Sequence, residues 1–208
     1  MLLERQQDSL KLVYKHKFIL QDSLTYGNFQ ACKHANGRDW WITFMKFKSN
    51  VFYSILVTPD TIYPPKQQAI GKIREADAGG QGKFSPKGTH FAFASIECGL
   101  NLYDFNRVTG KYSNPRYFKY PNSIPDYSSG LSFSPDGRFL YFCNALEMYQ
   151  VDLNGANDSI VPELIAGYDG FKDPIFGETL FLHSQLAPDG KIYWGTGPTS
   201  RFLHVTNY

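Results

Sequence analysis

Residues 133–142 read FSPDGRFLYF, and this stretch decides the fold because the chain repeats it. Residues 84–93 read FSPKGTHFAF, and residues 186–195 read LAPDGKIYWG. The glycines that the three copies share lie 49 and 53 residues apart: Gly88, Gly137 and Gly190. An internal period of this length is typical of repeat architectures. The repeat is therefore interpreted first, before a role is assigned to any single residue.

The chemistry of each copy is that of a tight turn between two strands. A proline fixes φ near −65° at the first turn position, an aspartate suits the next one, and the glycine accepts the positive φ that leads into the following strand. Alternating aromatic and aliphatic residues then predict a β-strand. We therefore expect a β-hairpin in each copy, with these turn residues: Pro86, Gly88, Pro135, Asp136, Gly137, Pro188, Asp189 and Gly190.

A first, weaker copy lies at residues 34–44, HANGRDWWITF. Asn36-Gly37 takes the place of Asp-Gly, and Gly37 lies 51 residues before the glycine of the next copy. Successive strand residues point to opposite faces of a sheet. Of Trp40 and Trp41 we therefore expect one to be largely buried and the other exposed.

Further strands follow each hairpin, so that each unit of about 50 residues holds about four strands. They are expected at residues 51–59, 68–75, 100–110, 114–121, 147–155, 162–168 and 201–207. Four-stranded units at this period predict an all-β fold, a β-propeller of about four blades. We expect one domain over residues 1–208, with blades at approximately 28–78, 79–127, 128–178 and 179–208.

Residues 11–20, KLVYKHKFIL, predict an extra strand without a unit of its own. In one interpretation this strand completes the last blade and closes a small ring. In the other it is the outer strand of a preceding blade, and the chain is an open fragment of a larger propeller. An open arc would expose strand edges and apolar blade faces, which favours self-association.

The blade motifs also carry a resemblance. FSPDGRFLYF and LAPDGKIYWG are similar to the repeat of WD40-like propellers of the PD40, TolB and YVTN types. Together with HANGRDWW and LYDFNRVTG they resemble uncharacterised secreted bacterial propellers associated with type IX secretion. The resemblance spans roughly residues 11–207 and implies a secreted or cell-surface location for the full-length form. It is specific for the fold and says little about function.

Composition narrows the class of partner. The 208 residues are 42% hydrophobic and 19% charged, and the formal net charge is +2, so no nucleic-acid partner is expected. No apolar run reaches the roughly 18 residues of a membrane span or forms a signal peptide, so we expect no membrane insertion, and a cytoplasmic location if the chain is complete. The three cysteines are expected as small buried residues, with one disulfide as the alternative: Cys32, Cys98 and Cys143.

The sequence offers few candidates for chemistry, and we assign no catalytic residue, metal site or cofactor. Residues 168–179, YDGFKDPIFGET, form the longest irregular stretch, and long loops on a rigid scaffold often bind ligands. Tyr168, Phe171 and Asp173 in this loop are therefore the predicted ligand-binding residues. His183 joins them, because the first strand of a blade lines the axial channel; the alternative is a structural histidine.

Two functions are compatible with these observations. The first is a non-catalytic binding or scaffold module that recognises a protein or a glycan, since no catalytic constellation is visible. The alternative is a propeller-type enzyme, such as a lactonase, a lyase or a quinoprotein-like oxidoreductase. It would require titratable side chains that converge on the axial channel. Whether the chain is an enzyme stays open at this point, with the binding module preferred.

Overall fold

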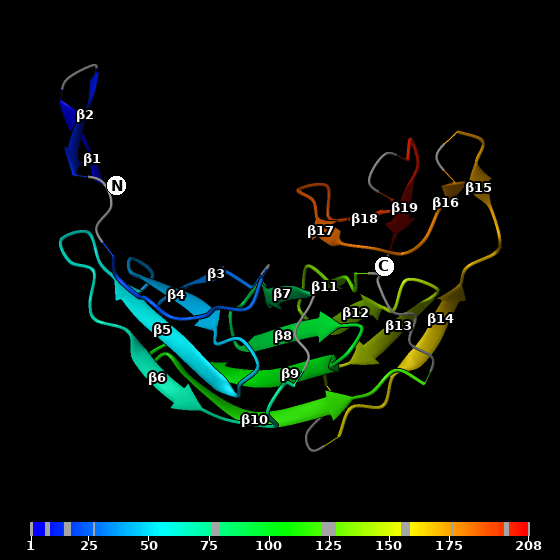
Figure 1. Cartoon of the computed structure of the whole chain (residues 1–208), viewed down its shortest axis with the longest axis horizontal. Helices are drawn as coiled ribbons and strands as arrows, with labels where there is room; N and C mark the ends of the chain where they lie inside the picture. The colour runs from blue at the N-terminus through cyan, green and yellow to red at the C-terminus, as the bar shows by residue number, and fades with distance from the viewer. Residues whose placement is uncertain are drawn as a thin grey trace.

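The computed structural model describes residues 2–6, 9–14, 18–26, 28–75, 80–121, 128–154, 159–175, 177–197 and 200–207. These residues form strands and no α-helix, so they contain no helix that could cross a membrane. Four antiparallel sheets follow one another around an arc (Figure 1). The predicted all-β propeller fold of four-stranded units is confirmed.

Three sheets have four strands, each paired with its neighbours in chain order. The first sheet contains β3 (Gln30–Lys33), β4 (Trp40–Met45), β5 (Val51–Val57) and β6 (Lys66–Ala69). The second contains β7 (Gln81–Phe84), β8 (His90–Ser95), β9 (Gly99–Asn106) and β10 (Lys111–Phe118). The third contains β11 (Leu131–Phe133), β12 (Phe139–Cys143), β13 (Glu147–Asp152) and β14 (Glu163–Gly167).

The fourth sheet has three strands among the described residues: β17 (Ser184–Leu186), β18 (Ile192–Gly195) and β19 (Leu203–Thr206). A small hairpin precedes it, made of β15 (Lys172–Asp173) and β16 (Gly177–Glu178). We expected boundaries between the first three blades after residues 78 and 127, and residues 76–79 and 122–127 lie outside the described part of the chain.

The N-terminal strand differs from the expectation. The strand predicted over residues 11–20 is β2 (Ser9–Tyr14), and residues 18–20 are not in a strand. Its partner is β1 (Leu2–Gln6), so the two strands form a hairpin of their own and β2 completes none of the other sheets. Figure 1 shows this hairpin set apart from the four sheets. The sequence pattern marked a strand there but held no information about its partner.

The turn between the first two strands of each sheet has the same geometry. Its glycine has positive φ in all four sheets: Gly37 at 75°, Gly88 at 68°, Gly137 at 75° and Gly190 at 84°. In the third sheet, the Asp136 carboxylate accepts hydrogen bonds from Ser134 Oγ at 2.6 Å and Arg138 N at 3.0 Å. These short polar contacts hold the strands at the angle that the tight turn requires.

The two adjacent tryptophans differ in burial, as the alternation of side chains along a strand predicts. Trp41 is 1% exposed and Trp40 is 45% exposed, so the expectation that only one is largely buried is confirmed. Trp41 Nε1 donates a hydrogen bond of 2.9 Å to the Arg107 carbonyl in the second sheet. A Cβ at Gly110 would lie 2.7 Å from the Trp41 ring, so only glycine fits there. Trp41 therefore joins the first two sheets.

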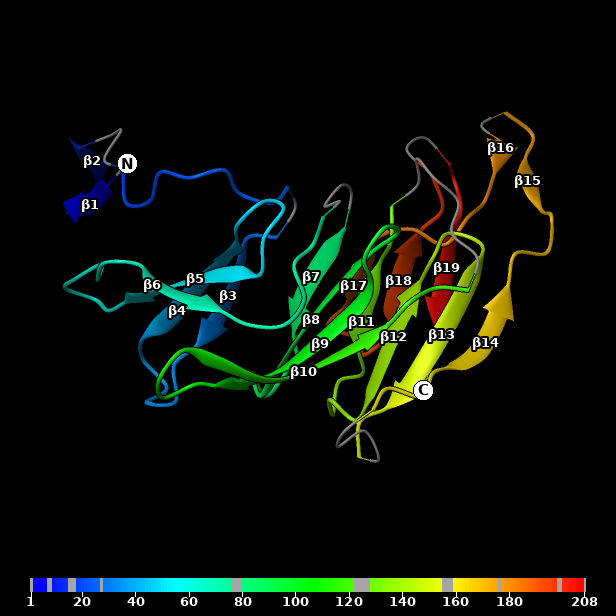
Figure 2. The same cartoon turned by 60° about the horizontal axis from the view of Figure 1, so that its bottom comes forward.

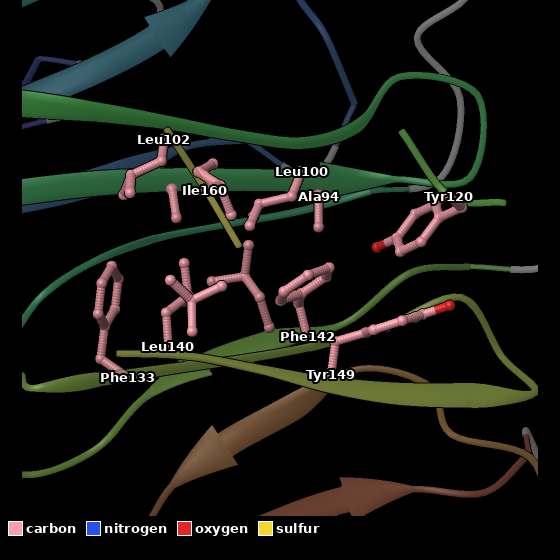
Figure 3. Close-up of a cluster of buried hydrophobic side chains, with 12 residues drawn as sticks. Ala94, Leu100, Leu102, Tyr120, Phe133, Leu140, Phe142, Tyr149 and Ile160 are labelled. Carbon is pink, nitrogen blue, oxygen red and sulfur yellow. The ribbon is translucent and has the colours of Figure 1, made fainter. Parts of the chain in front are cut away.

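Three hydrophobic clusters fill the spaces between consecutive sheets. The largest lies between the second and third sheets, where Leu100 and Leu102 face Leu140 and Phe142 (Figure 3). Figure 2 shows these two sheets side by side. A second cluster joins the first and second sheets, and a third joins the third and fourth. Burial of apolar side chains between the sheets is the main favourable contribution to the free energy of folding, because no single blade can cover both of its own faces.

The cysteines take part in this packing as free thiols. Cys32 and Cys143 are buried, and Cys98 is half-buried. No disulfide joins them in the structure, which corresponds to the first of the two expectations for these residues.

The inner strands of the sheets meet through one amide side chain. Strand β7 lies beside β11, and β11 lies beside β17. Gln81 on β7 donates from Nε2 to the Ser184 carbonyl at 2.9 Å, and its Oε1 accepts from Ser184 N at 3.0 Å. The same oxygen accepts from Leu131 N on β11 at 3.0 Å. We call these three hydrogen bonds the Gln81 bridge.

Replacing Gln81 by leucine should destabilise the protein by about 2–4 kcal/mol, because three backbone groups at the axis lose their partner. The measurement is the free energy of unfolding in urea, followed by circular dichroism. The control is Gln67→Leu on the exposed edge strand β6, which should change stability by no more than about 0.5 kcal/mol. Equal stability of the two variants would show that the bridge contributes nothing.

Candidate functional site

Two polar side chains meet at the inner strands of the second and fourth sheets, and a histidine lies within range of the charge of one of them. Lys83 lies on β7, Gln185 lies on β17, and His183 immediately precedes β17. Lys83 Nζ donates a hydrogen bond of 2.7 Å to Gln185 Oε1. We refer to Lys83, His183 and Gln185 as the axial site.

Strand alternation explains why these residues share a face. His183 and Gln185 are both exposed, whereas Ser184 between them is 4% exposed. On β7, Lys83 follows Gln81 by two residues and therefore lies on the same face as the amide of the Gln81 bridge. The bridge fixes β17 relative to β7, and this alignment places Gln185 within hydrogen-bond distance of Lys83.

The surroundings of His183 favour its neutral form. Desolvation lowers the pKa of the imidazole below its ordinary value of 6.5, and the positive charge of Lys83 lowers it further. Within the described part of the chain, neither ring nitrogen has a hydrogen-bond partner. The lowered pKa favours the neutral imidazole, which has an unprotonated ring nitrogen that can accept a proton.

Lys83 is half-buried, and desolvation lowers the pKa of its ammonium group as well. An ammonium group has three donors, and one of them is directed at Gln185. The amide of Gln185 cannot turn freely, because its Nε2 donates to the Leu186 carbonyl at 3.1 Å. Its oxygen therefore faces Lys83, and the remaining ammonium donors are available to a ligand.

Lys83 also belongs to a groove of about 430 Å³ between the first and second sheets. The groove begins at β3 and continues along β7 to the turn that follows it. Lys33, Lys87 and Arg107 line it together with Lys83. The axial site is therefore one end of a cationic surface that extends over two sheets.

The predicted loop residues form a group of their own. Tyr168 donates from its hydroxyl to the Phe171 carbonyl at 2.8 Å, and the Phe171 ring packs edge-to-face on Phe202 at 5.2 Å. Asp173 is 2% exposed, and its carboxylate accepts from Ile175 N and from the backbone and side chain of Arg201. Within the described residues, none of these contacts reaches His183 or Lys83.

The environment of Asp173 differs from that of a ligand-binding carboxylate, since protein groups enclose both of its oxygens. Tyr168 instead lines a cleft of about 670 Å³ between β14 and β19, and Phe171 is 48% exposed. Of the four residues predicted to bind a ligand, only His183 lies in the axial site.

Sequence reasoning missed Lys83, Gln81 and Gln185. Gln81 and Lys83 lie at alternate positions of a predicted first strand, as His183 and Gln185 do in the last unit. This alternation indicates that two residues share a face of one strand, but it does not indicate which strands lie side by side. Among the described residues, no group of three or more His, Cys, Asp or Glu side chains could hold a metal ion.

No family model matches the chain, and no curated protein sequence matches it. Its fold resembles several solved propellers. A putative 6-phosphogluconolactonase from Bacteroides uniformis matches 98% of the chain with a TM-score of 0.54 and 16% identity. A gluconolactonase from Xanthomonas campestris matches 94% with a TM-score of 0.46 and 13% identity. A putative TolB from Agrobacterium tumefaciens matches 83% with a TM-score of 0.43 and 17% identity.

The chain spans 62% of the length of the B. uniformis structure, 62% of the X. campestris one and 56% of the TolB one. The similarity to the B. uniformis structure, which has a TM-score above 0.5, supports a β-propeller fold. At this identity it establishes the fold alone.

The comparisons correct the expected function. A non-catalytic binding or scaffold module was the first interpretation, and it is wrong on this evidence, because the structure that follows almost the whole chain carries the name of an enzyme. The alternative, a propeller-type enzyme with an axial site, is the interpretation that the comparisons favour. The absence of a catalytic motif misled the first interpretation, since the axial site joins residues about 100 positions apart.

The pKa of His183 tests the electrostatics of the axial site. Replacing Lys83 by methionine removes a positive charge that disfavours the imidazolium, so the pKa of His183 should rise toward 6.5. NMR titration of the histidine ring signals measures this shift. Lys72→Met, which removes an exposed lysine elsewhere, should leave the titration of His183 unchanged; an equal shift in both variants would exclude a local effect of Lys83.

Proposed function

We propose that the protein is a propeller-type hydrolase that opens the ring of a lactone, a cyclic ester, at the axial site. The observation that carries this proposal is the proximity of His183 to the half-buried Lys83, which Gln185 holds by a hydrogen bond of 2.7 Å and whose charge lowers the pKa of the imidazole. The name of the B. uniformis propeller supports it, since a lactonase performs this reaction. Both the hydrolytic activity and the lactone substrate are part of this proposal.

His183 acts as the general base. It accepts a proton from a water molecule, and the water oxygen forms a bond to the lactone carbonyl carbon. The ring carbon–oxygen bond then breaks, and the proton passes from His183 to the departing alkoxide. The product is the open-chain hydroxy acid, and the histidine returns to its neutral form, so that all atoms and protons balance.

Lys83 stabilises the negative charge that develops on the carbonyl oxygen during attack. A fixed cation beside this oxygen lowers the energy of the tetrahedral intermediate more than that of the neutral ester. Desolvation and the charge of Lys83 both lower the pKa of His183, which favours the neutral form that a general base requires.

Gln185 and Gln81 are positioning residues. Gln185 holds the Lys83 ammonium group with its amide oxygen. Gln81 fixes β17 relative to β7 and so sets the distance between His183 and Lys83. A secreted or cell-surface location, which the repeat resemblance implies, remains a prediction, as does self-association.

Lactone hydrolysis by the purified protein tests this function. His183→Asn should lower kcat by about 100-fold or more, because the general base is lost. Lys83→Met should lower kcat by a similar factor through loss of oxyanion stabilisation. Initial rates of acid release from glucono-δ-lactone and its 6-phosphate, corrected for spontaneous hydrolysis, provide the measurement.

His90→Asn is the matched control, because His90 is a strand histidine whose pKa burial also lowers and it lies outside the axial site. It should keep the wild-type rate. The pH profile adds a second readout: activity should fall as the pH drops below the lowered pKa of His183, where the imidazole becomes protonated. Full activity of His183→Asn would refute the mechanism.

A further inference from the structure

The fourth sheet lacks the last strand that the other three sheets have. In the first three sheets this last strand is β6, β10 or β14, and it pairs antiparallel with the third strand of its sheet. The fourth sheet ends at β19, whose second edge pairs with no strand among the described residues. A strand edge in this state presents free backbone N–H and carbonyl groups, which can pair with an additional strand.

A cleft lies where the missing strand would pack. In the first sheet the last strand contacts the neighbouring sheet: Gln68 on β6 exchanges hydrogen bonds of 2.7 and 2.9 Å with the backbone of Tyr112 on β10. At the corresponding place between the third and fourth sheets, a cleft of about 670 Å³ separates β14 from β19. Its walls include the apolar side chains of Ile165, Phe181 and Val205, which an added strand would cover.

The side chains of β19 show the same incompleteness. Its neighbour on the third-sheet side is Phe181, whose ring lies 4.6 Å from the ring of His204. Leu203 and Val205 point to the other face and are 60% and 45% exposed. Cross-strand neighbours on an added strand would contact these two side chains and remove their apolar surface from water.

The chain also carries a last strand that has no sheet. Along the arc, the strand before the first strand of a sheet is the last strand of the preceding sheet: β6 precedes β7, and β10 precedes β11. By the same order β2 precedes β3 and takes the place of the last strand of a sheet before the first. Its sequence, SLKLVY, has leucine at alternate positions, a pattern typical of a strand with one apolar face.

Among the described strands, β2 pairs with β1 alone. A two-stranded hairpin by itself is marginally stable in water, so it gains stability by joining a larger sheet. The chain therefore contains both an unpaired sheet edge and a hairpin without a sheet.

These two features lie at different ends of the arc. The connection that follows the hairpin is attached to the first sheet, where Thr25 N donates to the Met45 carbonyl at 2.8 Å and Phe47 N donates to the Ser23 carbonyl at 2.9 Å. Both views place the hairpin beyond the first sheet and β19 toward the other end (Figures 1 and 2). In this arrangement a contact between β2 and β19 requires a second copy of the chain.

We propose that β2 of one copy pairs with β19 of a second copy, completes the fourth sheet and covers the cleft between β14 and β19. The pairing is antiparallel, as it is for the last strand of each of the first three sheets. In a two-fold symmetric dimer the exchange is reciprocal: each copy gives one strand and receives one, and neither β19 edge stays open. The interface uses no residue of the axial site, so it is independent of the proposed hydrolysis.

Sedimentation equilibrium measures the dissociation constant of this dimer, whose mass should be twice the 23.7 kDa of one chain. Leu10→Lys/Leu12→Lys changes β2, and Leu203→Lys/Val205→Lys changes β19. Each double variant should weaken dimerisation about 100-fold or more, because two charged groups would have to be buried in place of apolar ones. The serine versions of both double variants should weaken it in the same direction, and circular dichroism shows that a variant has kept its strands.

The control Ile73→Lys/Val108→Lys adds the same two charges at side chains that are 65% and 64% exposed in the first two sheets and their connections. It should leave the dissociation constant unchanged. Equal weakening by this control would show that added charge, and not the β2–β19 contact, reduces association.

Mixing the two strand variants identifies the contact itself. A mixed dimer keeps one intact pair, β2 from the β19 variant with β19 from the β2 variant. An affinity tag on one variant should therefore retain the other, although neither variant dimerises well alone. A monomeric wild type, a wild-type dimer that both variants leave intact, or a mixture no more associated than its components would each overturn the proposal.

Discussion

The relative placement of three inner strands depends on the amide of Gln81. In a propeller the inner strands of neighbouring blades meet at an angle and cannot continue one another's hydrogen-bonded ladder, so their backbone groups near the axis need other partners. Gln81 supplies them for two strands at once. Its amide pairs with both the N–H and the carbonyl of Ser184, as a strand residue would, and its oxygen also accepts from Leu131 N.

This bridge is a structural device with a chemical consequence. Because side chains alternate along a strand, the residue two positions after Gln81 faces the same axis, and the neighbours of Ser184 face it from the other side. These residues are Lys83, His183 and Gln185, and the 2.7 Å contact between Lys83 and Gln185 results from the alignment. Hydrophobic packing between sheets stabilises each pair of neighbouring blades, but only a directional contact sets the distance between two particular side chains.

The sequence predicts the local parts of this architecture well. Turn chemistry around Gly88, Gly137 and Gly190 and strand alternation at Trp40–Trp41 are determined by residues a few positions apart, and the structure has the positive φ values and the single buried indole that they require. The sequence does not predict the long-range contacts. Residues 83 and 185 are separated by most of two blades, and nothing in either segment identifies the other.

The same limit applies to two other segments, whose partners the sequence did not identify. Asp173 was predicted to bind a ligand because it lies in a long loop on a rigid scaffold, and in the structure its carboxylate accepts hydrogen bonds from Arg201, which is distant in sequence. The strand at the N-terminus was expected to join a blade, and it pairs instead with residues immediately before it. In both cases the sequence indicated the local feature, a carboxylate in a loop or a strand, but not the part of the chain that it contacts.

The energetics of the axial site argue for a functional origin. Desolvation is unfavourable for the charged forms of both Lys83 and His183, and it lowers the pKa of each group. The positive charge of Lys83 lowers the pKa of the His183 imidazole further. A pair of apolar or oppositely charged residues at positions 83 and 183 would stabilise the axis more. Arrangements that oppose stability and are nevertheless precisely supported, here by Gln185 and by the Gln81 bridge, are characteristic of catalytic and binding sites. In the neighbouring groove, Arg107 donates hydrogen bonds to the Lys33 and Lys87 carbonyls, and the described lining, which also includes Lys83, holds no aspartate or glutamate.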